Sequence, residues 1–349
     1  MLHLETATDV VVSKAMIRFG IVGFGLHAVR RMMPAFTASK KCTVTALSRR
    51  DPSKAAESAK QYKIPHAFTS VDELCNHSDV DAVFVTSPNS LHLPDVLAAV
   101  RAGKAVLCEK PLGMNSAECR QMVDAARQAN VLFGVAHVFR FEETTTRFRE
   151  VLHSGKLGRP VFARSEFCFR AEAGHPRKWL RDKTIAGAGP LFDIGVHCID
   201  TLRFVLQDDV VRVSARAVLE PPPSTIEAST AMVLEFERGT LANVSVSFAA
   251  EYRTPFELVG ELGTIRAEDA LTVEHPVKLE TRIKGKDAGT EKLSNHLAYI
   301  NQVDAFADAV EGKSPFPCTG EDGWQNQEIL DAAVRSIATG RAEDVPRVR

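Results

Sequence analysis

Short runs of apolar residues alternate with longer amphipathic segments over the first third of the chain. Such runs are typical of buried parallel strands, whose two faces are both covered by helices. We therefore predict strands at 17–22, 44–47, 82–85, 105–108 and 131–136. The segments 92–101 and 116–129 have a helical period, and Ser116 stands where an N-cap is needed. This rhythm predicts an α/β domain built on a parallel sheet.

A different pattern begins after a helical segment at 144–153. Apolar and polar residues now alternate, as in strands with one buried and one exposed face. These runs predict a largely antiparallel sheet with strands at 161–169, 210–219, 231–236, 241–249 and 256–259. The segment 301–338 returns to a helical period.

The two patterns divide the chain into three parts. We predict an N-terminal extension at 1–15, a parallel-sheet domain at 16–137 and an α+β domain with an open sheet at 138–349. The last helix is expected to pack back towards the first domain. A chain of 349 residues, of which 45% are hydrophobic, is long enough for two cores.

Charge and cysteine content narrow the class of ligand and the compartment. The net charge of −1 offers no electrostatic basis for binding nucleic acid or an anionic membrane, so we expect a small-molecule ligand. The seven cysteines form no C-x-x-C pair, and 1–14 holds no apolar run long enough for export or membrane insertion. These features favour a cytoplasmic protein. We expect no metal, because His, Asp and Glu show no ligand spacing.

A glycine-rich run directly follows the first predicted strand and opens a helix. Its first glycine permits a tight turn, its second lets a pyrophosphate approach the backbone, and its final alanine keeps the helix close to the sheet. The free N–H groups of the helix N-terminus would point at the pyrophosphate. A glycine turn without a ligand is the alternative, which the surrounding strands and helices disfavour. We therefore predict a dinucleotide site in the run Gly23, Phe24, Gly25, Leu26, His27 and Ala28.

The end of the second predicted strand bears on the choice between NAD and NADP. An NAD site carries an acidic residue there, which binds the ribose hydroxyls. This chain has Ser48, Arg49 and Arg50 instead. Guanidinium groups bind phosphate in a bidentate manner, and no carboxylate repels it, so we predict NADP with NAD as second choice. Asp51 could be the missing acid, although its place before Pro52 suits a helix N-cap better.

Three further residues suit the chemistry of hydride transfer. Asp193 and His197 are four residues apart, so a helix over 190–206 would place them on one face. Oxidation of an alcohol needs a base for the hydroxyl proton, and imidazole titrates near neutral pH. We predict His197 as acid/base, Asp193 as the group that binds substrate or orients the imidazole, and Lys110 as the cation that stabilises a developing alkoxide. A solvated lysine, a helix cap and a structural histidine are the alternative interpretations.

The same residues carry a resemblance to a known family. The Glu-Lys-Pro run at 109–111, the loop at 86–92 and the Asp-x-Gly-x-His run at 193–197 resemble the Gfo/Idh/MocA oxidoreductases, which include glucose-fructose oxidoreductase and inositol dehydrogenase. The resemblance extends over about 17–338. It implies a Rossmann domain followed by an open-sheet domain, catalysis by Lys110, Asp193 and His197, and a homodimer or homotetramer.

Further roles follow from the resemblance alone. Family members often have Asn where this chain has His137, which puts the role of His137 in doubt, and Glu109 could simply end its strand. Trp179 suits either the cleft or the core. On the cofactor side the resemblance places Ser87, Asn89, His92, Glu109, Lys110, His137 and Arg140. On the substrate side it places Lys110, Trp179, Arg181, Asp193 and His197.

We therefore expect an NADP(H)-dependent oxidoreductase that transfers hydride between nicotinamide and a carbonyl or alcohol carbon of a sugar, polyol or related molecule. The run 193–209 and Ser48 look particularly like 1,5-anhydrofructose reductases. Some family members hydrolyse glycosides through transient oxidation by bound NAD, which is one alternative; Ser48 and Arg49 argue against it. A non-catalytic NADP-binding regulatory protein is the other, and the presence of Lys110, Asp193 and His197 argues against that.

Overall fold

The apolar runs of the first third of the chain form a six-stranded sheet in the computed structural model, which describes residues 16–171, 177–221 and 224–348. Every pairing in this sheet is parallel, and the strand order is β3-β2-β1-β4-β5-β6. The strands are β1 (Ile17–Val22), β2 (Cys42–Ser48), β3 (His66–Phe68), β4 (Ala82–Val85), β5 (Ala105–Cys108) and β6 (Phe133–Val135). The predicted Rossmann sheet is confirmed.

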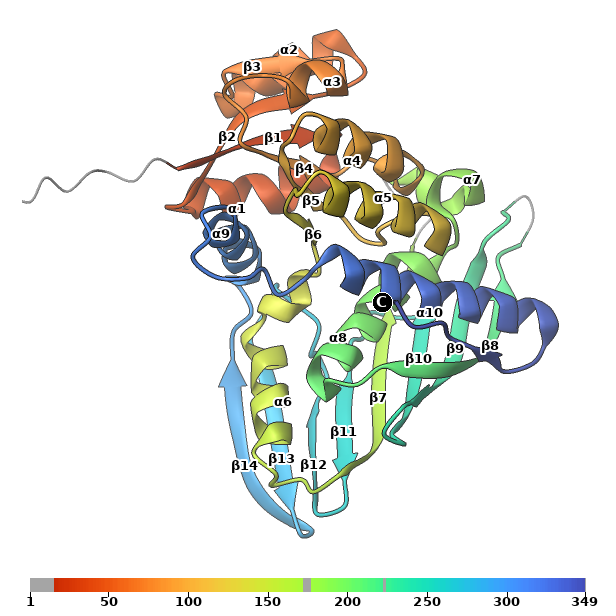
Figure 1. The fold of residues 1–349 in the computed structure, drawn as a ribbon. Helices are drawn as coiled ribbons and strands as arrows, with labels where there is room; N and C mark the ends of the chain where they lie inside the picture. Colours follow the sequence, from red (N-terminus) through yellow and green to blue (C-terminus); the bar gives the residue numbers. More distant parts are fainter. Residues whose placement is uncertain (1–15, 172–176, 222–223, 349) are drawn as a thin grey trace, which may run out of the picture.

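Helices cover both faces of this sheet, as the two-sided burial of its strands requires (Figure 1). On β1, Phe19 and Ile21 pack with one set of helices, whereas Val22 packs with the other. The helices are α1 (Met33–Ala38), α2 (Pro52–Tyr62), α3 (Val71–Cys75), α4 (His92–Arg101) and α5 (Ser116–Gln128). The strand order reverses between β1 and β4, and ligands of doubly wound folds bind at such a point.

The second sheet has nine strands in the order β14-β13-β12-β11-β7-β10-β9-β8-β15. Only β7 and β10 pair in parallel, so the predicted largely antiparallel sheet is confirmed. Its strands are β7 (Pro160–Cys168), β8 (Val210–Leu219), β9 (Glu227–Phe236), β10 (Leu241–Ser247), β11 (Phe256–Gly260), β12 (Gly263–Ala267), β13 (Val277–Ile283), β14 (Lys286–Leu293) and β15 (Glu343–Asp344).

One face of the second sheet is packed against helices. Ala242, Val244 and Val246 of β10 point into this core, whereas Leu241 on the same strand is 40% exposed. The packing helices are α6 (Glu143–His153), α8 (Val196–Leu206) and α10 (Gly320–Thr339). The shorter helices η3 (Val138–Phe141), η4 (Lys178–Arg181) and α7 (Lys183–Ala186) complete this part of the molecule.

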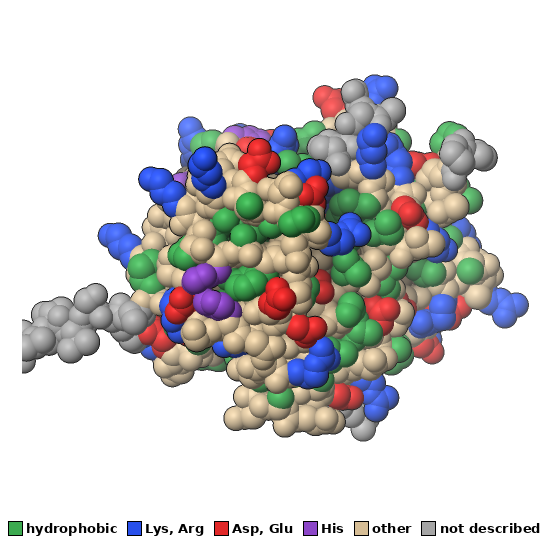
Figure 2. All heavy atoms as spheres, turned by 90° about the horizontal axis from the view of Figure 1, so that it is seen from above, with side chains coloured by type: hydrophobic (Ala, Val, Ile, Leu, Met, Phe, Trp, Pro, Cys, Tyr) green, Lys and Arg blue, Asp and Glu red, His purple; other side chains and the backbone are tan. Residues whose placement is uncertain are grey.

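Two helices from the end of the chain join the sheets. Helix α9 (Ala298–Val310) buries Val303 and Phe306 against the Rossmann core. Helix α10 lies between α5 and the second sheet (Figure 1), and Arg127 of α5 pairs with Glu321 of α10 at 2.8 Å. Among the described residues, no helix combines the length and the hydropathy that crossing a bilayer would require. Positive and negative side chains are interspersed over the face of the Rossmann domain in Figure 2.

The structure corrects several local predictions. Asn115, not Ser116, caps α5, because its side chain accepts from the Glu118 N–H while the Ser116 hydroxyl donates to Glu328 of α10. The region predicted as helical at 301–338 is two helices, separated at 311–319. Strands β3, β12, β13 and β14 were missed, because they are short or carry many exposed polar residues. Asp51 is the N-cap of α2, as its position before proline indicated.

Candidate active site

A cavity of about 410 Å³ lies where the glycine-rich loop and the loops after β4 and β5 face the second sheet. This volume suits a small-molecule or cofactor site. The predicted site residues that line it are Leu26, His27, Ser87, Asn89, His92, Glu109, Lys110, Trp179, Asp193 and His197. Residues from both parts of the chain therefore meet at one cavity.

The glycine-rich loop has the shape that a pyrophosphate needs. Gly23 has φ of +77°, and a Cβ atom there would lie 2.6 Å from the Ser87 backbone. A Cβ atom at Gly25 would meet only the Gly23 carbonyl oxygen, at 3.5 Å, so the space above Gly25 is open. The first glycine is thus needed for the turn and the second leaves room for a ligand. Phe24 is 1% exposed, packs against Tyr62 and does not line the cavity.

Ser48, Arg49 and Arg50 lie beyond this cavity, at the end of β2 and in the turn that follows. Ser48 is buried, the Arg49 guanidinium donates to Ser58 Oγ at 2.8 Å, and Arg50 is exposed. The Asp51 carboxylate is engaged by the N–H of Lys54 at 3.1 Å. The turn therefore presents two guanidinium groups, while its one carboxylate caps a helix.

Lys110 and Asp193 are in contact across the two halves of the molecule. Lys110 Nζ donates to the Asp193 main-chain oxygen at 2.7 Å and lies 3.5 Å from its Oδ1. Asp193 belongs to a π-helical turn (Leu191–Gly195) directly before α8, which modifies the predicted single helix. Arg177 binds both Asp193 oxygens, at 3.2 and 3.3 Å. Burial alone would raise the pKa of Asp193, but Arg177 and Lys110 outweigh it and lower that pKa.

His197 lies beside this group in an aromatic environment. Its ring centroid is 4.5 Å from that of Phe139 and 6.1 Å from that of Phe167. Its Nδ1 atom is buried and makes no hydrogen bond to any residue that the structure describes. Burial and the nearby Lys110 ammonium lower the pKa of His197 well below its ordinary value. The imidazole is therefore neutral at neutral pH and has hydrogen-bonding capacity to spare.

Glu109 and His27 connect the Lys110 segment to the glycine-rich loop. The His27 Nε2 atom lies 2.8 Å from Glu109 Oε1. Burial would raise the pKa of Glu109, but His27 and Lys110 hold it below its ordinary value. Glu109 is therefore an anion between two cationic or polar groups, which favours the interpretation that it orders this wall of the cavity.

The loop after β4 is held by its own polar side chains. Ser87 donates to Asp95 at 2.6 Å, and Asn89 donates to the Ala186 carbonyl at 2.9 Å. Both ring nitrogens of His92 face main-chain oxygens, at 2.9 Å from Ser87 and 3.0 Å from Pro111. These side chains position the loop and the Glu-Lys-Pro segment.

The cavity lining also lacks His137, Arg140 and Arg181. Arg140 is buried with Asp200 at 2.6 Å, and His137 accepts a hydrogen bond from Asn326 at 3.0 Å. Arg181 pairs instead with Glu220, the residue that follows β8, at 3.1 Å. These side chains satisfy buried or half-buried partners elsewhere, so the structure places them outside the site suggested by the resemblance.

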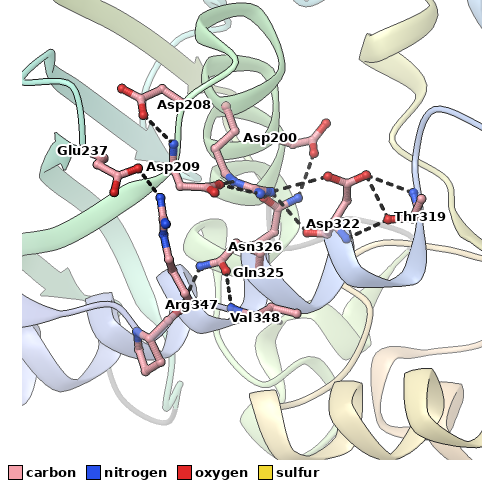
Figure 3. A network of polar contacts seen from close by, with 12 residues as sticks. Asp200, Asp208, Asp209, Glu237, Thr319, Asp322, Gln325, Asn326, Arg347 and Val348 are labelled. Atoms are coloured by element: carbon pink, nitrogen blue, oxygen red, sulfur yellow. Dashed lines mark hydrogen bonds and ion pairs between the residues drawn. The ribbon is translucent and has the colours of Figure 1, made fainter.

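The network around Arg140 joins α8 to the start of α10. Figure 3 shows Asp200 of α8 beside Asp322 and Asn326 of α10. Asn326 donates to Asp200 Oδ1 at 2.8 Å, and Thr319 and Asp322 form a capping box. These hydrogen bonds connect α8, which carries His197, to α10, which contacts both domains.

Sequence reasoning missed several cavity-lining residues. Arg177 contacts Asp193 directly, and its one local signal is its place just before Trp179. Phe139 of η3, Phe167 of β7 and Tyr252 between β10 and β11 carry no motif that marks them. Only the fold brings these side chains to one wall.

Comparison with known proteins agrees with this architecture. Residues 17–137 match the oxidoreductase family with an NAD-binding Rossmann fold, Gfo/Idh/MocA, and residues 145–266 match a C-terminal domain of the same family. The chain is 34% identical over 336 residues to 1,5-anhydro-D-fructose reductase of Ensifer adhaerens, covering 95% of this chain and 99% of the relative.

Two further relatives span similar lengths. Inositol 2-dehydrogenase 2 of Saccharopolyspora erythraea is 31% identical over 340 residues, 94% of this chain and 95% of the relative. The crystal structure of aldose-aldose oxidoreductase from Caulobacter crescentus, complexed with glycerol, superimposes with a TM-score of 0.88 at 25% identity, covering 95% of this chain and all of that one. The chain belongs to the Gfo/Idh/MocA family and is an NAD(P)-dependent oxidoreductase.

Proposed function

We propose that this chain is an NADP(H)-dependent reductase or dehydrogenase acting on a carbonyl or alcohol carbon of a sugar, polyol or related molecule. One observation carries the proposal: Lys110, Asp193 and His197 line a single cavity together with residues 26 and 27 of the glycine-rich run. The relatives named for 1,5-anhydrofructose and inositol support this substrate class.

The glycine-rich loop fits a dinucleotide, because Gly25 leaves open space where a pyrophosphate would approach. We assign Leu26, His27, Ser87, Asn89, His92 and Glu109 to the walls of that site. When bound, the nicotinamide supplies or accepts the hydride. The residues of the chain must then hold the substrate and handle one proton.

The neutral imidazole of His197 can accept the substrate hydroxyl proton during oxidation and return it during reduction. The Lys110 ammonium stabilises the negative charge that develops on the same oxygen. Asp193, kept ionised by Arg177 and Lys110, holds this ammonium in place and accepts hydrogen bonds from substrate hydroxyls. The three roles divide proton transfer, charge stabilisation and orientation.

A ring-shaped polyol suits the remaining wall of the cavity. Trp179, Phe167 and Tyr252 offer apolar faces, while Arg177 and Asp193 offer polar groups. Sugars and their anhydro derivatives present an apolar ring face together with hydroxyl groups. The first substrate to test is therefore 1,5-anhydro-D-fructose with NADPH.

The preference for NADP rests on the turn after β2. Ser48 replaces the acid that would repel a 2′-phosphate, and Arg49 and Arg50 supply guanidinium groups beside it. Arg49 contacts Ser58 through one nitrogen only, which leaves other donors for a phosphate.

The test is a parallel titration of the purified chain with NADPH and NADH, followed by nicotinamide fluorescence. We expect NADPH to bind at least about tenfold more tightly, or about 1.4 kcal/mol. Ser48→Asp should remove this preference, whereas Ser314→Asp, an equal charge in an exposed loop, should keep it. Equal affinities in the unmodified chain would overturn the NADP proposal. Copurified NAD that does not exchange, with aglycone release from a chromogenic glycoside, would favour the hydrolase instead.

We also propose that the chain forms a homodimer or homotetramer through the open face of the second sheet. Phe162 is 51% exposed and pairs in register with Leu241, which is 40% exposed. Val233 of β9, the strand that pairs with β10, is 38% exposed on the same face. Contiguous exposed apolar side chains of this kind favour association.

A further inference from the structure

A cluster of metal-ligating side chains lies outside the cavity, on the Rossmann domain. His66 of β3, His77 after α3 and Asp79 before β4 each offer one ligand atom, and these atoms lie within 4.8 Å of one another. His66 Nε2 is 2.9 Å from Asp79 Oδ2, and the two imidazole centroids are 4.1 Å apart.

We propose that these three residues form a binding site for a transition-metal ion of the zinc type. Two imidazoles and one carboxylate are ligands that Zn²⁺ accepts, and water can complete a four-coordinate site. With metal–ligand bonds of about 2.0–2.1 Å, ligand atoms at the corners of a tetrahedron lie about 3.4 Å apart, closer than the 4.8 Å within which the three atoms lie here. Small side-chain rotations therefore suffice to close the cluster around an ion.

The surroundings hold the ligands in place. Arg18 binds the other carboxylate oxygen of Asp79 at 3.0 Å, which leaves Oδ2 directed at His66. The Asp79 carbonyl accepts from Thr45 at 2.5 Å. Partners that fix a metal ligand in this way commonly accompany such sites.

The exposure and the charge of the site determine how an ion can enter and how tightly it can bind. Asp79 and His66 side chains are 46% and 31% exposed, so an ion can enter from solvent. Arg18 at Asp79 and Lys104, which donates to the His77 carbonyl at 3.3 Å, oppose a cation and limit its affinity. Imidazole ligands favour Zn²⁺, Co²⁺, Ni²⁺ or Cu²⁺ over Mg²⁺ or Ca²⁺. The seven cysteines are all buried and do not compete for the ion at the surface.

Metal binding would connect β3, the edge strand of the sheet, to the segment before β4. The Phe68 carbonyl of β3 accepts from the Arg49 N–H at 3.1 Å, so β3 also supports the turn after β2. None of the three ligands lines the cavity. The bound ion would therefore stabilise the nucleotide domain without entering catalysis.

The experiment is calorimetric titration of tag-free, EDTA-treated full-length chain with ZnCl₂. We expect the unmodified chain to bind one zinc ion. The zinc affinity should be at least about tenfold weaker in His66→Ala and in His77→Ala. Zinc should raise the melting temperature of the unmodified chain but not that of either variant. His275→Ala is the matched control, because His275 is also half-exposed beside a carboxylate, Asp269, at 3.6 Å. It should bind zinc as the unmodified chain does.

A second measurement distinguishes loss of metal binding from loss of the folded structure. Co²⁺ bound by two imidazoles should give visible absorption bands. ZnCl₂ should abolish these bands by displacing the Co²⁺, whereas MgCl₂ should leave them. An unchanged circular dichroism spectrum shows that the chain stays folded throughout. No saturable zinc binding would overturn the proposal. Equal zinc binding by a folded His66→Ala, His77→Ala double variant would overturn it too.

Discussion

At the scale of single residues, Lys110 is where the two parts of the molecule meet at the cavity. It follows β5 of the parallel sheet, and its ammonium contacts Asp193 of the second domain at 2.7 Å through the main-chain oxygen. Arg177 shares the same carboxylate, so Asp193 remains an anion between two cations. A cation held in this position can meet a developing alkoxide without reorganising.

Lys110→Met should therefore lower kcat by about 10²–10³-fold, because it removes charge stabilisation on the reacting oxygen. NADPH binding should change by less than about threefold, since the glycine-rich loop is untouched. The measurement is NADPH oxidation with 1,5-anhydro-D-fructose, beside a fluorescence titration of cofactor. Lys178→Met, an exposed lysine in η4, serves as the control and should stay active. An unchanged kcat in Lys110→Met would refute the role of this lysine.

At the scale of elements, the turn from β1 into the first helix combines two glycines with different tasks. Gly23 has a positive φ and faces the Ser87 backbone, whereas Gly25 faces open space. The fold needs the first, and the ligand needs the second.

Alanine at these two positions should separate folding from cofactor binding. Gly23→Ala should lower the free energy of unfolding by about 1–3 kcal/mol, because its methyl group meets backbone and the φ is strained. Gly25→Ala should leave the melting temperature within a few degrees yet weaken NADPH binding by about tenfold or more. Thermal melts and cofactor titrations check both. Equal effects of the two variants on stability would contradict this division.

A second feature at this scale is the buried polar network that connects α8 to α10. Arg140, Asp200 and Asn326 surround His137, and burial lowers the pKa of His137 to about 4. The unfolded chain takes up this proton first as the pH falls from the ordinary value of 6.5. The neutral histidine thus contributes stability that is full above pH 6.5 and is lost as the pH falls through 4.

His137→Asn should make the stability less dependent on pH within this window. The slope of the unfolding free energy should fall by up to about 1.4 kcal/mol per pH unit, the contribution of one proton. Urea denaturation at several pH values measures the slope. His92 and His197 have lowered pKa values as well, but they remain in the variant and in the control, His275→Asn. Indistinguishable slopes for the two variants would show that His137 is not the source.

At the scale of the whole molecule, the cavity lies between two sheets joined by helices from the end of the chain. Helix α9 completes the core of the Rossmann domain, and α10 contacts both domains. Helices cover only one face of the nine-stranded sheet, so Phe162 and Leu241 remain exposed on the other. The open face thus leaves apolar side chains exposed among the residues described.

Phe162→Lys should shift the chain towards monomer, because a charge would be buried in the apolar interface proposed on this face. Light scattering after size exclusion gives the mass. Val334→Lys, at a 38% exposed position of α10, is the control and should keep the mass of the unmodified chain. The proposal fails if Phe162→Lys has that same mass.

The sequence by itself determined the class of the fold and the residue types at the cavity. Parallel strands are buried on both faces and antiparallel strands on one, so local periodicity distinguishes the two domains. The glycine-rich loop, Lys110, Asp193 and His197 occur in contiguous motifs, which could be recognised without knowing the fold. Asp51 could be predicted as a cap because capping is a local interaction.

Only the tertiary structure decided which side chains share a space. Arg177 reaches Asp193, and His66 reaches Asp79, through contacts that no spacing indicates. It also directed Arg140 and Arg181 away from the cavity, because each finds a carboxylate elsewhere. Hydrophobic period and capping depend on neighbours along the chain, whereas ion pairs and cavities depend on segments that the fold brings together.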